Sequence, residues 1–147
     1  MIREATHSDI PRIAELGARF HAQAGWDEIE YSVEDCAKSL SNLMQSGAFI
    51  CLVADVGGIV GMAAGIISPV YFSHGHVSGE ELFWWVSEDA PQMTGVRLLD
   101  GLEKAAKAKG CQSWQMKSLD RLNGARMTKL YERRGYRASE QIFIKRL

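Results

Sequence analysis

Cysteine is scarce in this chain, the net charge is small, and long apolar runs are lacking. The three cysteines, Cys36, Cys51 and Cys111, form no Cys-x-x-Cys pair, and each lies in an apolar stretch, which favours buried, reduced thiols over disulfides or a metal site. The formal net charge is −1 at pH 7, so we expect no bulk attraction to nucleic acid or to membrane surfaces. No apolar run is long enough to cross a bilayer, and a polar, charged stretch follows the first residues, so we expect a cytoplasmic protein.

The chain also lacks the marks of several architectures. It has no internal repeat, no low-complexity tract and no domain linker. Its 147 residues are enough for a substantial core, so we expect a single domain over residues 1–147. Neither a Gly-x-Gly-x-x-Gly run nor a Gly-x-x-x-x-Gly-Lys-Ser/Thr run occurs, which argues against the common α/β nucleotide-binding folds.

Helical periodicity dominates the N-terminal third. After a strand at residues 2–5, apolar residues recur at helical spacing in two separate runs. Thr6 with Asp9, and Ser32 with Asp35, have the spacing of capping boxes, which predicts where the two helices begin.

Strand patterns take over from Ala48 onward. Gly57 and Gly58 predict a hairpin turn, because both positions tolerate positive φ. The expected elements are strands at 49–54, 59–67 and 82–86, a loop at 68–79, a helix that ends at Gly110, a strand at 111–117, a helix at 123–134 and a final strand at 141–147. The order β-α-α-β-β-β-α-β-α-β predicts an α/β fold with a mixed sheet, because the hairpin is antiparallel and the later β-α-β crossover favours parallel pairing.

The segment 123–136 is the most informative part of the sequence. It predicts a helix that presents Tyr131 and then breaks into a final strand. Leu-Tyr-Glu-Arg-Arg-Gly-Tyr at 130–136 resembles the closing motif of the GNAT family of acyl-CoA N-acyltransferases, and residues 53–61 are similar to its second and third strands. Glu-Leu-Phe-Trp-Trp-Val at 81–86 resembles a variant found in phage and prophage members. The resemblance covers nearly the whole chain and implies a GNAT-like mixed, mostly antiparallel central sheet of six to seven strands flanked by four helices.

The resemblance also implies acetyl-CoA as the co-substrate. In the family, pantetheine pairs with the fourth strand, here Trp84, Trp85 and Val86. The asparagine at the start of the last helix, here Asn123, bonds the pantetheine arm, although Asn123 also suits a helix N-cap. The pyrophosphate binds N–H groups at a helix N-terminus. The matching residues are Gln92, Met93, Thr94, Gly95, Val96 and Arg97.

This loop departs from the family signature, Gln/Arg-x-x-Gly-x-Gly/Ala. Aligning the last glycine with Gly95 puts Met93 at the first glycine position and Ala90 at the leading position. Aligning Gln92 with the leading position instead puts Arg97 last. Glycine serves there because the backbone must approach the phosphates closely. Arg97 would compensate by pairing with a phosphate, or it is simply an exposed helix residue.

Two residues are the candidates for proton transfer. Tyr131 occupies the position of the family's general acid, and a phenol with a pKa of about 10 suits protonation of a thiolate, although such a tyrosine most often packs at the edge of a core. In some members of the family, a glutamate six residues before the end of the fourth strand accepts the amine proton through water, and the resemblance puts Glu80 at that position. Strict alternation places Glu80 on the face of Trp84 and Glu81 on the opposite face. For both, and more so for Glu81, the alternative is a solvated residue at a strand start.

Other polar residues suit the acceptor side. His74 and His76 titrate in a range suited to a base, but their His-x-His spacing has no third ligand nearby, so we expect no metal site. Asp27, Glu28 and Glu30 lie between the first two helices, a segment that usually walls the acceptor site in this fold. They suit a cationic amine, or they form a solvated acidic loop.

We therefore expect an acetyl-CoA-dependent N-acetyltransferase that transfers an acetyl group to a primary amine of a small molecule or a peptide by direct attack. The alternative is a catalytically inactive CoA-binding or partner-binding module whose pyrophosphate loop has degenerated. The sequence does not specify the acceptor. Homodimers are common in this fold, and only residues 136–147 follow Gly135, which leaves room for a partner to complete the sheet.

Overall fold

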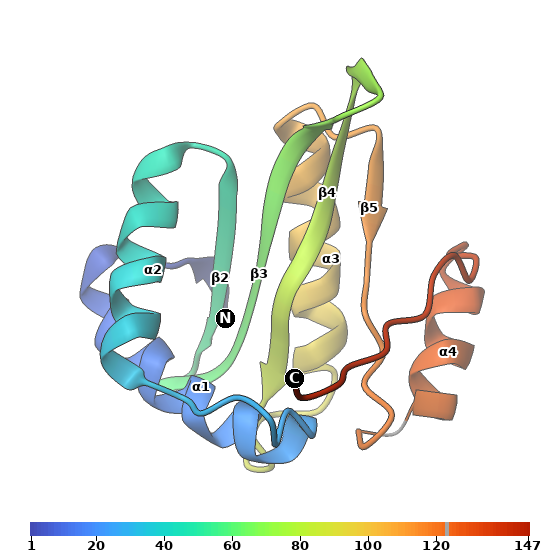
Figure 1. The fold of residues 1–147 in the computed structure, drawn as a ribbon. Coiled ribbons are helices and arrows are strands. Elements are labelled where there is room, and N and C mark those ends of the chain that lie inside the picture. The colour runs from blue at the N-terminus through green and yellow to red at the C-terminus, as the bar shows by residue number, and fades with distance from the viewer. Residues whose placement is uncertain (123) are drawn as a thin grey trace.

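The computed structural model describes residues 1–122 and 124–147 (Figure 1). Its helices are the short 3-10 helix η1 (His7–Asp9), α1 (Ile10–Ala24), α2 (Val33–Ser46), α3 (Thr94–Ala108) and α4 (Gly124–Arg133). Its strands are β1 (Ile2–Glu4), β2 (Phe49–Asp55), β3 (Ile59–Val70), β4 (Ser73–Val86) and β5 (Ser113–Gln115). The four predicted α-helices are confirmed, and position 123 lies outside the described residues.

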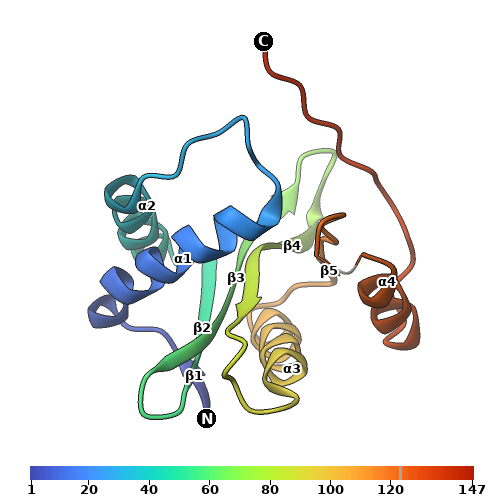
Figure 2. The same cartoon turned by 90° about the horizontal axis from the view of Figure 1, so that it is seen from below.

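The strands form one sheet in sequence order. β1 to β4 pair antiparallel, and β5 joins β4 in parallel. Figure 2 shows α1 and α2 on one face of the sheet, α3 on the other, and α4 beyond β5. The prediction of a mixed, mostly antiparallel sheet is confirmed. The prediction of six to seven strands is wrong, because the described residues contain five.

Alternating side chains of the central strands fill a core on each face of the sheet. On the first face, Val53 packs with Leu16 of α1, and on the second face, Leu52 packs with Leu98 and Leu102 of α3. Adjacent residues such as Leu52 and Val53 serve opposite faces because successive strand residues point to opposite sides. The uninterrupted apolar run of β2 follows from this burial on both faces.

No helix in the described part of the chain has the length and apolar character that a membrane crossing requires.

Two predicted elements differ from the structure. The loop at 68–79 is wrong, because β3 continues to Val70 and β4 begins at Ser73, so only Tyr71 and Phe72 remain at the tip. The residues there have weak strand propensity, and pairing with the neighbouring strand overrides it. The final strand at 141–147 is also wrong: this segment is extended but pairs with no strand among the described residues.

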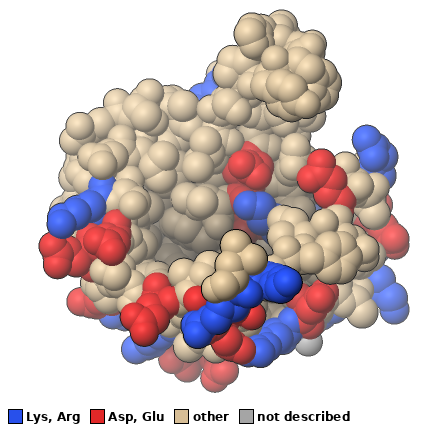
Figure 3. Space-filling view, in the orientation of Figure 1, with Lys and Arg blue, Asp and Glu red and all other residues tan. Residues whose placement is uncertain are grey.

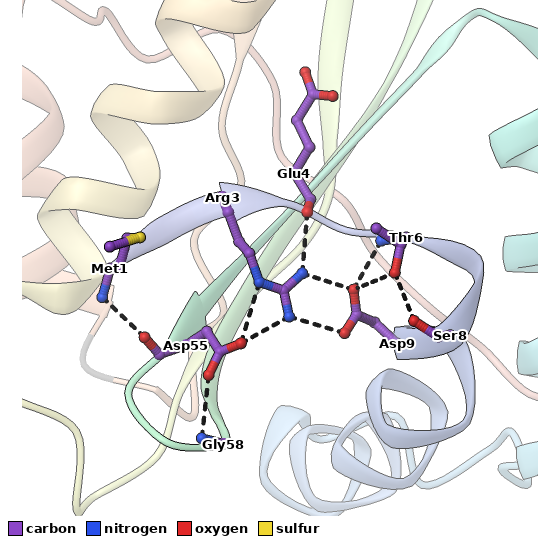
Figure 4. Close-up of polar contacts among 8 residues, drawn as sticks. All are labelled: Met1, Arg3, Glu4, Thr6, Ser8, Asp9, Asp55 and Gly58. Carbon is purple, nitrogen blue, oxygen red and sulfur yellow. Dashed lines mark hydrogen bonds and ion pairs between the residues drawn. The ribbon is translucent and has the colours of Figure 1, made fainter.

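The capping box at Thr6 is confirmed, and at Ser32 only the N-cap half of the predicted box is present. Asp9 accepts the Thr6 N–H at 2.7 Å, and the Ser32 hydroxyl accepts the Asp35 N–H at 3.1 Å. Asp9 also belongs to an ion-pair network that the sequence did not indicate (Figure 4). Arg3 contacts Asp9 and Asp55 at 2.8 Å each, which ties β1 to η1 and to the end of β2. The hydrogen bonds from Arg3 hold the pKa of both carboxyl groups below the usual range.

Candidate active site

The strands β4 and β5 separate halfway along the sheet. Their pairing covers only three residue pairs, from Ser78 opposite Ser113 to Glu80 opposite Gln115. Beyond Glu80, β4 continues to Val86, bonded to β3 alone, while the chain after β5 turns toward α4 (Figure 1). One edge of β4 therefore carries main-chain polar groups without a strand partner in the described part of the chain. The place where the two strands diverge, beyond Glu80, is called the gap below.

A bulge in β4 reverses the predicted orientation of its two glutamates. Phe83 pairs with Ala64 and Glu81 pairs with Gly65, so Leu82 is the extra residue. Paired residues share a face of the sheet. Glu81 therefore lies on the face that α3 covers (the α3 face), where Trp84 also lies, and Glu80 lies on the face that α1 and α2 cover (the α1 face). The predicted alternation, with Glu80 on the face of Trp84, is therefore wrong.

Glu81 is buried and bridges the gap at its narrow end. Its side chain is 5% exposed, and its Oε2 accepts the N–H of Lys117, just after β5, at 2.9 Å. Burial raises the pKa of this carboxyl to about 7, against the weaker opposing effects of that hydrogen bond and of the lysine charge. The interpretation of Glu81 as a solvated residue is wrong, since the bulge turns it inward.

Tyr131 contacts Lys117, the same residue that Glu81 contacts. Its hydroxyl donates to the carbonyl of Lys117 at 2.7 Å, and its ring packs against Trp84 and Tyr136 at centroid distances of 6.3 and 5.5 Å. Burial, with a smaller contribution from the charge of Glu81, raises its pKa above the ordinary value. The structure thus shows a core-edge tyrosine with a satisfied hydroxyl at the predicted place. Its role as an acid stays a prediction.

Glu80 faces solvent. Its side chain is 54% exposed, and a carboxylate oxygen lies 3.7 Å from Nζ of Lys117. On the molecular face seen in Figure 3, the surface is hollowed in the middle, and acidic and basic side chains lie around the hollow. An exposed carboxylate in reach of solvent has the access that a proton acceptor needs, and its role stays a prediction.

The start of α3 packs against the end of β4. The indole N–H of Trp84 donates to the carbonyl of Gly95 at 3.0 Å, and Val86 lies close enough to Gly95 that a Cβ there would contact it at 3.4 Å. The structure therefore brings these three predicted residues together. The side chain of Trp85 points the other way, into the α1 face, where its N–H donates to Gln23 at 3.0 Å. Only the main chain of Trp85 can border the gap.

The first turn of α3 has the features of an anion site. Thr94 is held by Pro91, which accepts its hydroxyl at 2.6 Å and its N–H at 3.2 Å. The N–H groups of Gly95 and Val96 have no acceptor within residues 1–122 and 124–147, and the helix dipole makes this end positive. Arg97, one turn in, is exposed and forms no ion pair within those ranges.

Met93 precedes this turn in a backbone conformation that favours glycine. Its φ is 68°, in the left-handed region, and its side chain is 60% exposed. This is the position that the first alignment matched to the first glycine of the family signature. The chain adopts this left-handed conformation although a side chain is present, and that side chain is exposed. Gln92 is exposed beside it, and Asn123 lies outside the described residues.

The closing motif attaches α4 to α3. The Tyr136 hydroxyl donates to Glu103 at 2.8 Å, and Arg134 lies 3.1 Å from the same carboxylate and also pairs with Asp100. The second tyrosine and the arginine of the motif are therefore structural contacts that position the helix carrying Tyr131.

The predicted acceptor wall is held in place by two contacts. Asp27 accepts two hydrogen bonds from Arg121, at 3.2 and 2.6 Å, and the His21 ring contacts the carbonyl of Ile29 at 2.7 Å. Asp27 is thus neutralised by a partner. Glu28 has a buried carboxylate oxygen, Oε2, that finds no hydrogen-bond partner in the described part of the chain.

Two residues near the gap were not predicted from the sequence. Lys117 contacts both predicted catalytic residues, and nothing in its local pattern distinguishes it. Trp114 lies across Gly65 and Gly79, where any Cβ would collide with its indole. Isolated glycines within strand patterns indicate such a close approach, but not which side chain makes it.

The predicted loop histidine His76 lies on β4 and contacts Ser113 at 2.8 Å. Among the described residues, no cluster of three His, Cys, Asp or Glu side chains could hold a metal ion.

Among known proteins, only solved structures are similar to this chain. No protein-family model matches the sequence, and no curated protein matches it. Solved structures match over the whole chain. A predicted acetyltransferase of Clostridium acetobutylicum, solved with acetyl-CoA, has a TM-score of 0.79 at 14% identity, with 99% of this chain and 95% of that one covered. The ribosomal-protein-alanine N-acetyltransferase of Brucella melitensis biovar Abortus 2308 has 0.70 at 21%, with 100% and 99% covered.

A third similar structure is a transcriptional regulator from Bacillus halodurans C-125, with a TM-score of 0.76 at 19% identity and 100% and 99% coverage. At such identities, the likeness shows the fold alone: the chain has the GNAT-like α/β fold, with four helices around one mixed five-stranded sheet. The resemblance to phage-type members stays a prediction.

Proposed function

We propose that the protein is an N-acetyltransferase that uses acetyl-CoA as donor and a primary amine of a small molecule or a peptide as acceptor. The observation that carries the proposal is the gap between β4 and β5. An unpaired strand edge follows the gap from Glu81 to Val86, and Tyr131 and the start of α3 lie beside it. The similar Clostridium structure contains acetyl-CoA.

The residues at the gap suit CoA. The free N–H groups of Gly95 and Val96, with the guanidinium of Arg97, would hold the pyrophosphate. The unpaired main chain from Trp84 to Val86 would pair with the pantetheine amides as a neighbouring strand does. Met93 keeps the loop in the conformation that glycine would adopt, with its side chain outward, so it does not obstruct these N–H groups.

The chemistry requires one proton acceptor and one donor. Acetyl-CoA supplies the thioester. The ammonium group of the acceptor first loses one proton to solvent. The neutral amine nitrogen then bonds to the acetyl carbon and loses its second proton to Glu80 through water, while the carbon–sulfur bond breaks. Tyr131 exchanges its hydrogen bond with the Lys117 carbonyl for one with the departing thiolate, and protonates it. A phenol, whose ordinary pKa is about 10, is protonated at neutral pH, as a donor must be, and burial raises the pKa of Tyr131 further.

We propose that the acceptor is cationic before it reacts. Glu28, with its unpartnered carboxylate oxygen, and Glu30 lie in the α1–α2 segment and would attract an ammonium group. Asp27 contributes less, since Arg121 already pairs with it.

The second candidate is a binding module without catalytic activity. It is favoured by Met93, which replaces a glycine in the family signature. The Bacillus halodurans protein is named as a transcriptional regulator, so this fold also occurs under a name that is not enzymatic.

Ligand-induced stabilisation tests acetyl-CoA binding, which the enzyme and a CoA-binding module share. Acetyl-CoA at about 100 times its dissociation constant should raise the free energy of unfolding by about 2.7 kcal/mol. Arg97→Ala should weaken binding about tenfold or more, because it removes a charge-assisted bond. Lys104→Ala is the matched control, since it removes one exposed positive charge farther along the same helix.

Release of free thiol from acetyl-CoA, measured with a panel of amines, then tests catalysis. Binding without thiol release would favour the binding module. If millimolar acetyl-CoA left the unfolding transition unchanged, both the enzyme and the CoA-binding module would be excluded.

A further inference from the structure

A cavity of about 290 Å³ opens at the β2 side of the sheet, whereas the gap lies between β4 and β5 at the other side. Residues 49–51 of β2 line its floor. Its walls include Met44 of α2 and Ala105 of α3, and these two helices cover opposite faces of the sheet (Figure 2). The cavity therefore lies along the edge of the sheet itself, and it shares no residue with the candidate active site.

The cavity exists because β1 is shorter than β2. β1 pairs with β2 over three residues, and the chain then turns into η1. The Ala48 carbonyl accepts the N–H of Ile67 on the β3 side, so residues 49 and 51 direct their main-chain groups to the opposite side, toward β1. Ala5 donates to the Cys51 carbonyl at 2.9 Å, but the N–H and C=O of Phe49 have no partner among the described residues. The cavity thus occupies the place that a longer β1 would fill.

Opposite charges lie at the two ends of this cavity. At the β1 end, the Glu4 carboxylate points away from the ion pairs of Arg3 and has no partner within residues 1–122 and 124–147 (Figure 4). At the other end, Nζ of Lys109 donates to the Gly47 carbonyl at 3.2 Å, and no carboxylate of the described chain pairs with it. Each charge is therefore free to bind a ligand group of opposite sign.

We propose that this cavity binds a short peptide with free ends, two or three residues long, which adds to β2 as a continuation of β1. The ammonium group of the peptide lies at Glu4, and its carboxylate lies at Lys109. One of its residues exchanges two main-chain hydrogen bonds with Phe49. Because the site is remote from the gap, this peptide is a ligand and not the acetyl acceptor.

The strand direction and the charges select the same orientation. A peptide in line with β1 runs antiparallel to β2, so its N-terminus lies toward Glu4 and its C-terminus toward Lys109. This orientation brings each end of the peptide to the residue of opposite charge. Parallel addition would place like charges together at both ends, so the residues at the ends disfavour it.

The dimensions also suit a short peptide. Residues 49–51 offer about 10 Å of strand edge, because a strand advances by about 3.3 Å per residue. The volume is near the lower limit of small-molecule pockets, about 300 Å³. Met44, Ile50 and Ala105 provide apolar walls, which suit small apolar side chains.

The first test is a titration of the isotope-labelled, full-length protein with trialanine, followed by amide NMR. The amides of Phe49 and Cys51 should shift, and those of residues 113–117 beside the gap should not. Free alanine should bind more weakly, because it is too short to pair with Phe49 and to reach both charges. No shifts with millimolar trialanine, shifts confined to residues 113–117, or equal affinity for alanine would each overturn the proposal.

Blocked peptides test the two charges separately. N-acetyl-trialanine and trialanine amide should each bind about fivefold more weakly than trialanine, because each lacks one ion pair. Glu4→Gln should remove the effect of N-acetylation and keep that of amidation, and Lys109→Met should do the reverse. Lys107→Ala is the control, because this nearby exposed lysine does not line the cavity, and it should keep both effects.

Equal affinity of the unmodified protein for free and blocked peptides would overturn the assignment of the two ends. All titrations are carried out without acetyl-CoA. Their outcomes are therefore independent of the proposed acetyltransferase function.

Discussion

Glu81 and Tyr131 bind the same residue from two sides. Glu81 accepts the N–H of Lys117 at 2.9 Å, and Tyr131 donates to its carbonyl at 2.7 Å. Together they attach β4 and α4 to the point where the chain leaves β5. The width of the gap therefore depends on two side chains from opposite ends of the site, one of them a buried carboxyl.

Glu81→Gln should change how stability depends on pH. The raised pKa means that folded Glu81 keeps a proton that the unfolded chain has lost between about pH 4.5 and 7. The unmodified protein should therefore lose stability as pH rises through this window. Glu81→Gln should be flatter and, at about pH 8, more stable by an amount on the order of 2 kcal/mol.

Urea unfolding across this pH range would measure the effect. Glu80→Gln is the control, because that carboxylate is exposed, and it should leave the profile unchanged. An identical pH profile for Glu81→Gln and the unmodified protein would contradict the burial of Glu81.

Tyr131→Phe should separate catalysis from structure. It removes the bond to Lys117 and should cost about 1 kcal/mol of stability, while acetyl transfer should fall by about 100-fold or more with acetyl-CoA affinity nearly unchanged. Tyr136→Phe also loses one partly buried hydroxyl contact, to Glu103, but has no predicted role in proton transfer. Equal transfer rates in the two variants would remove Tyr131 from the mechanism.

Met93→Gly and Met93→Ala should differ although the side chain is exposed. Alanine keeps the cost of a left-handed backbone, whereas glycine relieves it but loses more entropy on folding. At a φ of 68°, we expect Met93→Gly to be more stable than Met93→Ala by about 1 kcal/mol, measured by calorimetry. If alanine were equal or better, the left-handed conformation at this position would be wrong.

Asp9→Asn should reduce the loss of stability in acid. Arg3 lowers the pKa of Asp9 in the folded state, so the stabilisation is complete above the unfolded pKa, about 3.9, and disappears as pH falls through the lower folded value. The unmodified protein should therefore weaken below about pH 4, and Asp9→Asn should be less stable at neutral pH but flatter in acid. Arg3→Lys, which keeps the charge but not the paired geometry, should fall between them in thermal unfolding.

Sequence patterns predicted what depends on neighbours along the chain. The helices, the Gly57–Gly58 hairpin and the caps at Thr6 and Ser32 follow from short-range spacing, and the order of these elements is enough to indicate the fold. Trp84, Val86 and Gly95 meet because that order brings the end of β4 to the start of α3.

Short-range sequence patterns could not predict contacts between segments that lie far apart in the chain. The bulge at Leu82 depends on how β4 meets Ala64 and Gly65, and it decided which glutamate is buried. The network of Arg3 joins residues more than fifty positions apart. The tail at 141–147 has strand-forming residues, but a strand also requires an edge to pair with.

The attachment of Arg134 and Tyr136 to Glu103 has a mechanical consequence. These contacts bind α4, which carries Tyr131, to α3, whose start would face the phosphates. We therefore expect the two helices to move together. A ligand that draws the start of α3 toward itself would also change the distance between Tyr131 and β4. In such an arrangement, one displacement of α3 and α4 would accompany acetyl-CoA binding and would also set the position of the Tyr131 hydroxyl.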